Sequence, residues 1–286
     1  MVERSESAAV LVTGAAGGIG LATTKTLIQR GYRVYAGVHT AGAELTGIPG
    51  VEVLELDVTS TDSVRAAAKE VAAREGSAGL RAVVNNAGVI VQGPLELVPP
   101  DELYRQFAVN VLGPVEVTRA FLPLLRQGRG RVINVSAPTA RLAVPFNGPI
   151  SASKSALESL SHAARVELAP WGIPVVIVVP GGIDTAIFAK AAAAAETALG
   201  SADPERVALY ARQLDAVAAA TSTMSTSPPQ TVADTIARAI GAARPKTRYL
   251  ANRDARIFAV LSHLPVRLRD RLLTRTLGLH KIVASH

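Results

Sequence analysis

A glycine-rich string near the amino terminus has the composition of a phosphate-binding turn. It reads Thr-Gly-Ala-Ala-Gly-Gly-Ile-Gly over residues 13–20, after an apolar run and before a helical pattern. Glycine permits a tight turn and lets backbone amides approach a pyrophosphate, which the positive end of a helix attracts. Such a turn can also serve folding alone, but the strand and helix patterns beside it favour a dinucleotide site. The predicted contacts are Gly14, Gly18, Ile19 and Gly20.

Further motifs follow the glycine string in a fixed order. They are Leu-Asp-Val-Thr around Asp57, Asn-Asn-Ala-Gly at 85–88, Asn110, Ser-Ala-Ser-Lys ending at Lys154, and Pro-Gly-Gly-Ile-Asp-Thr at 180–185. Together they resemble the short-chain dehydrogenase/reductase family over about residues 8 to 251. The resemblance implies a nicotinamide dinucleotide site, in which Asp57 touches the adenine and the 180–185 segment folds over the nicotinamide.

The resemblance also assigns individual roles. Lys154 and Asn110 are the expected catalytic residues, the first binding ribose and the second supporting the local helix geometry. The remaining positions that it assigns to the cofactor are Asp57, Val58, Asn86, Ala87, Gly88, Lys154, Pro180, Gly181, Ile183 and Thr185.

Two reacting hydroxyls of that family are absent. Family members use a Tyr four residues before the Lys as general acid or base, and a Ser thirteen residues before the Tyr to hold the substrate carbonyl. Counting back from Lys154 gives Ile150 and Ala137 at these positions. An aliphatic side chain can neither exchange a proton nor bind an oxyanion, and each loss typically costs about 10²–10⁴-fold in rate. We therefore expect ordinary alcohol and ketone interconversion to be severely impaired.

Few polar residues near these positions in sequence could replace the missing acid. Ser136, Asn147 and Asp184 are the nearest, and each could equally be a strand-end, loop or turn residue. His162 lies two helical turns beyond Lys154, about 12 Å away, which suits a packing or interface role. The predicted substrate pocket consists of Ala137, Asn147, Ile150 and Gly182.

The residues after the second predicted strand bear on the choice of cofactor. Family members that use NAD carry an acid there, because a carboxylate accepts both ribose hydroxyls and repels a 2′-phosphate. This chain has Val38 followed by His39. A His can become protonated beside a phosphate, so we predict NADP(H) in preference to NAD(H), with His39 at the 2′-phosphate. The alternative is a solvent-facing turn residue in a permissive site.

Short Val- and Ile-rich runs alternate with helical patterns, which predicts a buried parallel sheet with helices on both faces. Strands are expected at 8–13, 33–38, 51–56, 81–85, 131–135, 174–179 and 247–251. Helices are expected at 19–30, 61–74, 100–127 with a break, 151–169 and 231–243. Because no composition break interrupts the series, we expect one α/β domain over 1–286, a Rossmann fold with a doubly wound parallel sheet of about seven strands.

Two segments lie outside this alternation. Residues 186–229 are Ala-rich and follow the sixth predicted strand, at the sheet edge where ligands bind. We interpret them as a substrate lid, with a packed pair of surface helices as the alternative. Residues 252–286 form a basic tail in which apolar positions recur every three or four residues on either side of Pro265, which predicts two amphipathic helices.

The excess charge of the chain gathers near that tail. The net charge is +7, and ten basic and two acidic residues after position 243 contribute +8, so the first 243 residues carry −1. A nearly neutral nucleotide domain gives no reason to expect a nucleic-acid partner. We expect the tail to pack on its own domain or on a sister subunit of a homo-dimer or homo-tetramer. The alternative is peripheral contact with an anionic membrane.

Composition excludes several further classes of site. The chain has no Cys, which removes disulfides, thiolate nucleophiles and zinc–cysteine centres, and we expect no metal. No apolar run approaches the ~20 residues of a membrane span, and the amino terminus lacks the layout of a signal peptide. We therefore expect a cytoplasmic protein that acts on a small molecule.

These observations support several functions. The leading hypothesis is an NADP(H)-binding enzyme that works on a small, largely apolar substrate without the Ser and Tyr hydroxyls. It would reduce an iminium ion or catalyse a non-redox cyclisation or isomerisation. The alternatives are a nucleotide-binding pseudoenzyme and an ordinary carbonyl reductase inactivated by engineered replacements at 137 and 150.

Overall fold

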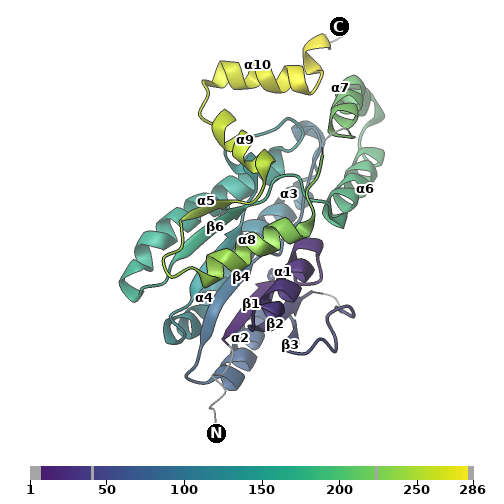
Figure 1. Cartoon of the computed structure of the whole chain (residues 1–286). Helices are drawn as coiled ribbons and strands as arrows, with labels where there is room; N and C mark the ends of the chain where they lie inside the picture. Colours follow the sequence, from purple (N-terminus) through teal and green to yellow (C-terminus); the bar gives the residue numbers. More distant parts are fainter. Residues whose placement is uncertain (1–7, 40–41, 223–224, 283–286) are drawn as a thin grey trace.

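Seven parallel strands form a single sheet in the computed structural model, which describes residues 8–39, 42–222 and 225–282. Their spatial order is β3-β2-β1-β4-β5-β6-β7, so the chain reverses direction across the sheet between β1 and β4 (Figure 1). The strands are β1 (Ala9–Thr13), β2 (Arg33–Val38), β3 (Val51–Glu55), β4 (Leu80–Asn85), β5 (Arg131–Val135), β6 (Val175–Val179) and β7 (Arg248–Leu250). In such a sheet, ligands bind beyond the carboxyl ends of the strands at the point of reversal.

Helices cover both faces of this sheet. The bounds of the helices that cover the sheet are α1 (Gly18–Gln29), α2 (Thr61–Glu75), α3 (Pro100–Phe107), α4 (Gly113–Gln127), α5 (Gly148–Glu167) and α8 (Pro229–Gly241). On one face Leu27 of α1 and Ile236 of α8 pack on strand residues such as Val12. On the other, Val64 of α2 and Phe121 of α4 pack on residues such as Leu11. Strands β1, β5 and β6 are buried throughout, and their residues are mostly apolar, apart from Thr13 of β1 and Arg131 and Asn134 of β5.

The predicted α/β fold is confirmed, and the expected break in the 100–127 helix is confirmed as well. It takes the form of a π-helical turn, η2 (Ala108–Leu112), between α3 and α4. The stretch Pro100–Gln127 has 28 residues and contains an 18-residue window with a mean hydropathy of 1.3, so by length and composition alone it could cross a membrane. Here it packs against β4 and α2, as a core helix does.

The Ala-rich insertion forms two helices, α6 (Ala186–Gly200) and α7 (Pro204–Ser222). A three-residue contact fastens α7 to the short turn η1 (Leu95–Leu97) after β4. The Nε and Nη2 of Arg206 donate to Glu96 Oε1 at 3.1 and 3.0 Å, and Tyr210 donates to Glu96 Oε2 at 2.7 Å. These hydrogen bonds, the Tyr210 bond foremost, lower the pKa of Glu96. Tyr210 also meets the edge of Phe146, with ring centroids 6.5 Å apart.

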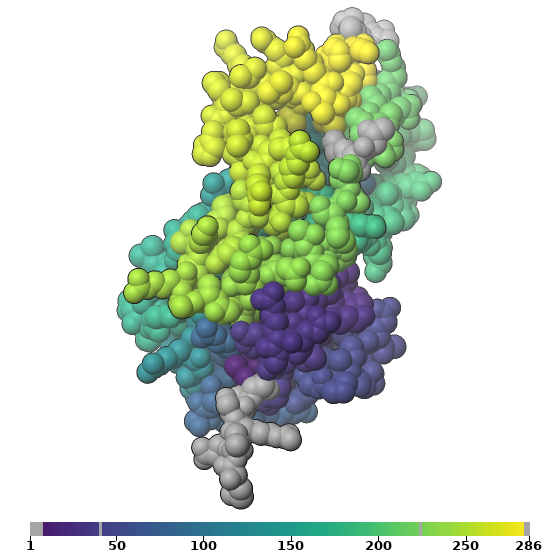
Figure 2. All heavy atoms as spheres, viewed as in Figure 1, coloured from purple at the N-terminus to yellow at the C-terminus, as the bar shows by residue number. Residues whose placement is uncertain are grey.

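The basic tail forms the two predicted helices, α9 (Arg253–Leu261) and α10 (Val266–Thr276), and ends in a short turn, η5 (Leu279–Lys281). Figure 2 shows this tail capping one end of the molecule beside the insertion. The Cβ of Ala216 in α7 lies 3.8 Å from the position that a Cβ would take on Gly278. The tail therefore packs on its own chain, while Val260 and Val266 remain exposed.

Candidate functional site

The glycine turn between β1 and α1 is packed so closely that side chains would not fit. Gly14 has φ +62°, and a Cβ on it would lie 2.8 Å from Cα of Ala87. A Cβ on Gly20 would overlap the backbone of Gly14, and one on Gly18 would lie 2.6 Å from Cγ2 of Thr185. The predicted residues Gly14, Gly18 and Gly20 therefore lie close to one another. They also lie close to the segment after β4 and to the segment after β6.

Thr13, which sequence reasoning had not singled out, joins β1 to the segment after β4. Its Oγ1 accepts hydrogen bonds from the backbone N–H groups of Asn86 and Ala87 at 3.1 and 3.0 Å. The Asn86 amide in turn donates to the backbone oxygens of Thr13 and Gly14 at 2.9 and 3.1 Å. These hydrogen bonds hold the carboxyl ends of β1 and β4 together.

The amino end of α1 is left electrostatically positive. Its N-cap is Gly17, which has no side chain to accept from the first-turn amides, and the first turn contains no acid. Backbone N–H groups at a helix start attract an anion when no side chain satisfies them. Ile19 belongs to this first turn of α1. The residues predicted to bind phosphate at the junction of β1 and α1 therefore lie together.

His39 and Asp57 meet at the ends of β2 and β3. Their Nε2 and Oδ2 atoms lie 3.6 Å apart, and the His39 side chain is 72% exposed. Burial would raise the pKa of Asp57, but hydrogen bonds from the Thr59 hydroxyl and amide and the nearby His39 outweigh it and lower that pKa. Val58, the next residue, packs on Gly113 at the start of α4. The two residues predicted for the adenosine end are therefore neighbours.

Asn110 is completely buried within the π-helical turn η2. Its Oδ1 accepts from the backbone N–H of Val89 at 2.9 Å, and its Nδ2 donates to the Val89 oxygen at 3.0 Å and to Ser153 Oγ at 3.4 Å. Gln106, one helical turn earlier, donates to the same Val89 oxygen and accepts from Val91 N–H. These amides fix the segment after Gly88 to α5.

Lys154 is buried one turn into α5 and directs its Nζ at the backbone oxygen of Val135, 2.7 Å away. Burial lowers the pKa of Lys154 to about 8, and the Glu158 carboxylate acts in the opposite sense. A Cβ on Gly88 would lie 3.8 Å from Nζ and 3.3 Å from Oδ1 of Asn110. The two predicted catalytic residues therefore converge beside the segment after β4.

Ala137 and Ile150 lie on the two elements that flank Lys154. Ala137 precedes the short turn η3 (Pro138–Ala140) after β5, and Ile150 is in the first turn of α5 with 7% of its surface exposed. The Ile150 backbone oxygen accepts from Ser153 Oγ at 2.9 Å. Both side chains are aliphatic, so neither can donate to a substrate oxygen.

The four polar residues considered as replacements for the missing acid lie in different environments. Ser136 is 3% exposed and donates its hydroxyl to Glu158 Oε1 at 2.7 Å. The Asn147 amide donates to the Pro145 oxygen in its own loop at 3.3 Å. Asp184 is exposed, and His162 contacts Arg165 Nη1 at 3.0 Å from a later part of α5. Of these four residues, Asn147 is the nearest to Ile150 in the sequence and precedes the first turn of the same helix.

Glu158 is the functional-site residue that sequence reasoning missed. It is 5% exposed and lies one turn beyond Lys154. Besides Ser136, it pairs with Arg141 at 3.2 Å and with Arg248 of β7. These contacts, in which Glu158 is buried and the two arginines are partly exposed, connect the last strand to the helix that carries Lys154. The partners of Glu158 are distant in sequence, so no local spacing of residues predicts these contacts.

The segment after β6 runs through Pro180, Gly181 and Ile183 toward Thr185. Ile183 is 3% exposed and forms an isolated parallel bridge with Ser227. A Cβ on Gly181 would overlap the side chain of Asn252. The predicted nicotinamide segment is thus held between the insertion and the tail, while Gly182 remains partly exposed.

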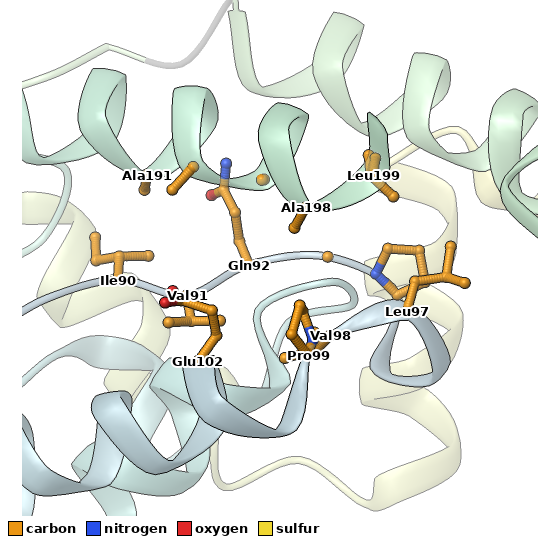
Figure 3. Close-up of a pocket in the computed structure, with 14 residues that line it drawn as sticks. Ile90, Val91, Gln92, Leu97, Val98, Pro99, Glu102, Ala191, Ala198 and Leu199 are labelled. Carbon is orange, nitrogen blue, oxygen red and sulfur yellow. The ribbon is translucent and has the colours of Figure 1, made fainter. Parts of the chain in front are cut away.

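A shallow groove lies between the segment after β4 and α6. Figure 3 shows Ala191, Ala198 and Leu199 of α6 facing Ile90 and Val98, with the Gln92 side chain pointing toward the helix. Gln92 and Glu102 are the polar residues among those that line it, and the other lining residues are apolar. The space inside it holds no more than a few water molecules, and Ala137, Ile150 and Lys154 are not among the lining residues.

Comparison with known proteins adds independent information. A family model described as short chain dehydrogenase matches residues 8–196. Retinol dehydrogenase 7 of Mus musculus is 34% identical over 276 residues, which cover 92% of this chain and 87% of that protein. A 3-amino-tetrahydro-pyrrolizinone reductase of Xenorhabdus hominickii is 32% identical over 203 residues, or 71% of each chain.

Two further similarities concern length and fold. Estradiol 17-beta-dehydrogenase 2 of Rattus norvegicus is 42% identical over 188 residues, 63% of this chain and 49% of that protein, so the chain spans about half the length of this relative. A short chain dehydrogenase from Burkholderia cenocepacia, solved in complex with NADP, superposes with a TM-score of 0.72 at 28% identity, covering 94% of this chain and 98% of that one.

Proposed function

Because the chain belongs to the short-chain dehydrogenase family, we propose that it binds NADP(H) and acts on a small, largely apolar substrate without a Ser and Tyr pair. One observation carries the proposal. The turn of glycines and the buried Lys154 are intact, while aliphatic Ala137 and Ile150 flank that lysine. Cofactor binding is thus expected to persist where ordinary proton transfer is lost.

The residues of the first strand–helix junction fit a dinucleotide. The uncapped amino end of α1 would hold the pyrophosphate, and His39 would lie at the adenosine ribose, where its exposed imidazole can pair with a 2′-phosphate. Lys154 would bind the nicotinamide ribose. When bound, the nicotinamide supplies or accepts a hydride. NADP is favoured because residues 38 and 39 offer no carboxylate to the ribose hydroxyls.

An iminium ion is the substrate class that best suits the missing hydroxyls. Hydride addition forms a C–H bond at the iminium carbon while the C=N π electrons move to nitrogen, so a neutral amine results and no proton is needed. A ketone needs a proton donor for the developing alkoxide, which neither Ala137 nor Ile150 provides. One relative is named for reduction of a nitrogen heterocycle, and two others for retinol and estradiol, which are apolar.

The α6–α7 insertion would act as a lid over this substrate. Its apolar α6 face lines the groove beside Ile90, and Glu96 fastens α7 through Arg206 and Tyr210. Because both partners of the Glu96–Arg206 pair are nearly half exposed, the contact is weak enough to open.

The test compares two substrates of similar size. NADPH oxidation is followed at 340 nm with N-methyl-1-pyrrolinium and with cyclopentanone, after fluorescence titration has established NADPH binding. We expect oxidation with the cation and little with the ketone. Turnover of cyclopentanone alone contradicts the iminium assignment, and absence of NADPH binding at millimolar concentration contradicts the proposal as a whole.

A nucleotide-binding protein without turnover is the second candidate. It is favoured by the loss of both hydroxyl positions together with the commitment of Ser136 to Glu158. Such a protein would bind NADPH yet oxidise it with neither probe. Non-redox cyclisation or isomerisation would give the same result in this assay, and would show as conversion of an unsaturated apolar substrate at constant NADPH.

A further inference from the structure

Gly182 leaves an open position between two oxygen atoms that both accept hydrogen bonds. A Cβ built on this glycine would have three nearest neighbours: Ser225 O at 3.4 Å, Asp254 Oδ2 at 3.7 Å and Thr226 Cγ2 at 3.8 Å. None is close enough to exclude an atom placed there, and Gly182 itself is partly exposed. Gly182 is also one of the predicted substrate-pocket residues. The oxygens therefore border the space expected to hold substrate.

Asn252 fixes this arrangement. It is the N-cap of α9, with Oδ1 accepting from Ala255 N–H at 3.1 Å, and its Nδ2 donates to Ser227 Oγ at 3.1 Å and to the Gly182 oxygen at 3.4 Å. Ser227 N–H donates to the same Gly182 oxygen at 2.9 Å. Through these contacts, the first turn of α9 and the end of the insertion are both fastened to the segment after β6. Asp254, two residues after the cap, is positioned by them.

The Asp254 carboxylate has no cationic partner among the residues that the structure describes. No Lys, Arg or His within 8–39, 42–222 and 225–282 lies within 4 Å of it. Its neighbours Arg253 and Arg256 are exposed, although the surrounding tail is rich in arginine. Without such a partner, the carboxylate is available to accept a charge-assisted hydrogen bond from a bound cation.

We propose that Asp254 and the Ser225 carbonyl form a subsite for a cationic nitrogen of the substrate, an iminium or protonated amine. The inference rests on the proposed function and names its substrate class. Two acceptors without a donor favour a positive N–H group and oppose a carbonyl oxygen, which is itself an acceptor. Asp254 is a specificity residue here, since it orients and attracts substrate and exchanges no proton with it.

The kinetic consequence has a definite form. Hydride addition removes the positive charge of an iminium, so the carboxylate stabilises the bound substrate at least as much as the transition state. Removal of that charge should therefore raise KM for a cationic substrate about tenfold or more and leave kcat unchanged or higher. A residue needed only for helix stability would show no such division between KM and kcat.

The control comes from the same helical position in another helix. Asp254 is the second residue of α9, and Asp62 is the second residue of α2, with a side chain 98% exposed. Both carboxylates interact favourably with the helix amino end. D254N and D62N therefore remove equivalent helix-end charges, but only D254N removes one beside Gly182.

The experiment uses the full chain saturated with NADP⁺ and measures the Kd of N-methylpyrrolidinium by NMR titration, with cyclopentanone as the neutral probe. We expect the wild-type protein to prefer the cation, D254N to lose at least tenfold in affinity for it, and D62N to match the wild type. Equal affinity in D254N, or no preference for the cation in the wild type, overturns the inference.

A separate NADPH titration distinguishes this from failure of the proposed function. If NADPH binds but the cation is not preferred, the subsite is wrong and the cofactor assignment stands. If NADPH does not bind, the cation titration is repeated without nucleotide. A cation affinity that still depends on Asp254 then keeps the subsite and shows that the proposed redox function is wrong. Thermal unfolding of D254N shows that the variant is folded before affinity is compared.

Discussion

Lys154 Nζ donates to the backbone oxygen of Val135, two residues before Ala137, and only 8% of the lysine surface is exposed. The pKa of this lysine falls to about 8 in the folded chain, against about 10.4 for an unfolded lysine. Below pH 8 both states hold the proton, so the penalty of burying the charge is fully present and independent of pH. Between pH 8 and about 10.5 the unfolded state binds more protons, so the free energy of unfolding should rise with pH, by about 3 kcal/mol from this group.

The measurement is urea unfolding of the wild type and Lys154→Met at several pH values from 7 to 10.5. Because methionine has no proton to lose, the difference between the two proteins isolates Lys154. We expect the wild type to gain stability relative to the variant as pH rises through 8. A difference that stays constant over this range would show that Lys154 is not desolvated as described.

The contact between His39 and Asp57 predicts the consequence of reversing charge at position 39. His39→Asp places a second carboxylate beside Asp57 and opposite a 2′-phosphate, so NADPH should bind about tenfold or more weakly while NADH is little affected. His263→Asp makes the same change at an exposed tail position and serves as the control. Fluorescence titration of both cofactors gives the ratio, and an unchanged ratio would remove His39 from the cofactor site.

Restoring both hydroxyls tests whether the site has merely lost its acid and oxyanion donor. The double variant Ile150→Tyr with Ala137→Ser should gain about 10²-fold or more in ketone reduction if Lys154 and Asn110 are otherwise placed for it. The control, Ile150→Phe with Ala137→Ser, lacks only the phenol hydroxyl. Equal activity of the two variants on a panel of ketones would show that the rest of the site has diverged as well.

Glu158 should be a major determinant of stability. Glu158→Gln removes the charge that Arg248 and Arg141 face, and because these side chains are 19% and 41% exposed, we expect a loss of about 2 kcal/mol. Glu167→Gln, an exposed residue at the end of the same helix, is the control. Urea unfolding midpoints measure the difference, and similar midpoints would mean that water already reaches the cluster.

The contact of Glu96 with α7 predicts how the insertion opens. Glu96→Gln weakens the bonds from Arg206 and Tyr210, so trypsin should cut the α6–α7 insertion faster at its exposed basic residues Lys190 and Arg212. Glu116→Gln breaks an exposed pair with Arg119 in α4 and provides the control. The rates come from electrophoresis of timed digests. Equal rates for both variants would show that Glu96 does not hold the insertion closed.

Much of the fold could be predicted because its determinants are local. Most strands contain a short run of Val, Ile, Leu or Ala, and helical patterns separate most of them, so the order of elements follows from the sequence. The π-helical turn at Asn110 could be foreseen only as a break, because the extra residue per turn depends on how the Asn110 and Gln106 amides reach Val89.

Other parts of the site depend on contacts between distant residues. Glu158 meets partners at positions 136, 141 and 248, and Asp254 reaches Gly182 only because Asn252 caps α9 against Ser227. Neither relationship leaves a regular spacing in the chain. Both require β7 and the tail to be placed on the sheet before they can be recognised.

The close packing of the glycine turn limits which substitutions this protein can accept during evolution. A Cβ on Gly14 would clash with Ala87, one on Gly18 with Thr185, and one on Gly20 with Gly14, all within one chain and with no nucleotide needed. Mutation away from glycine there is opposed by folding itself. A descendant that lost its cofactor would keep these three residues, whereas His39 and Lys154 would be free to drift, so selection for nucleotide binding leaves its trace at those two positions.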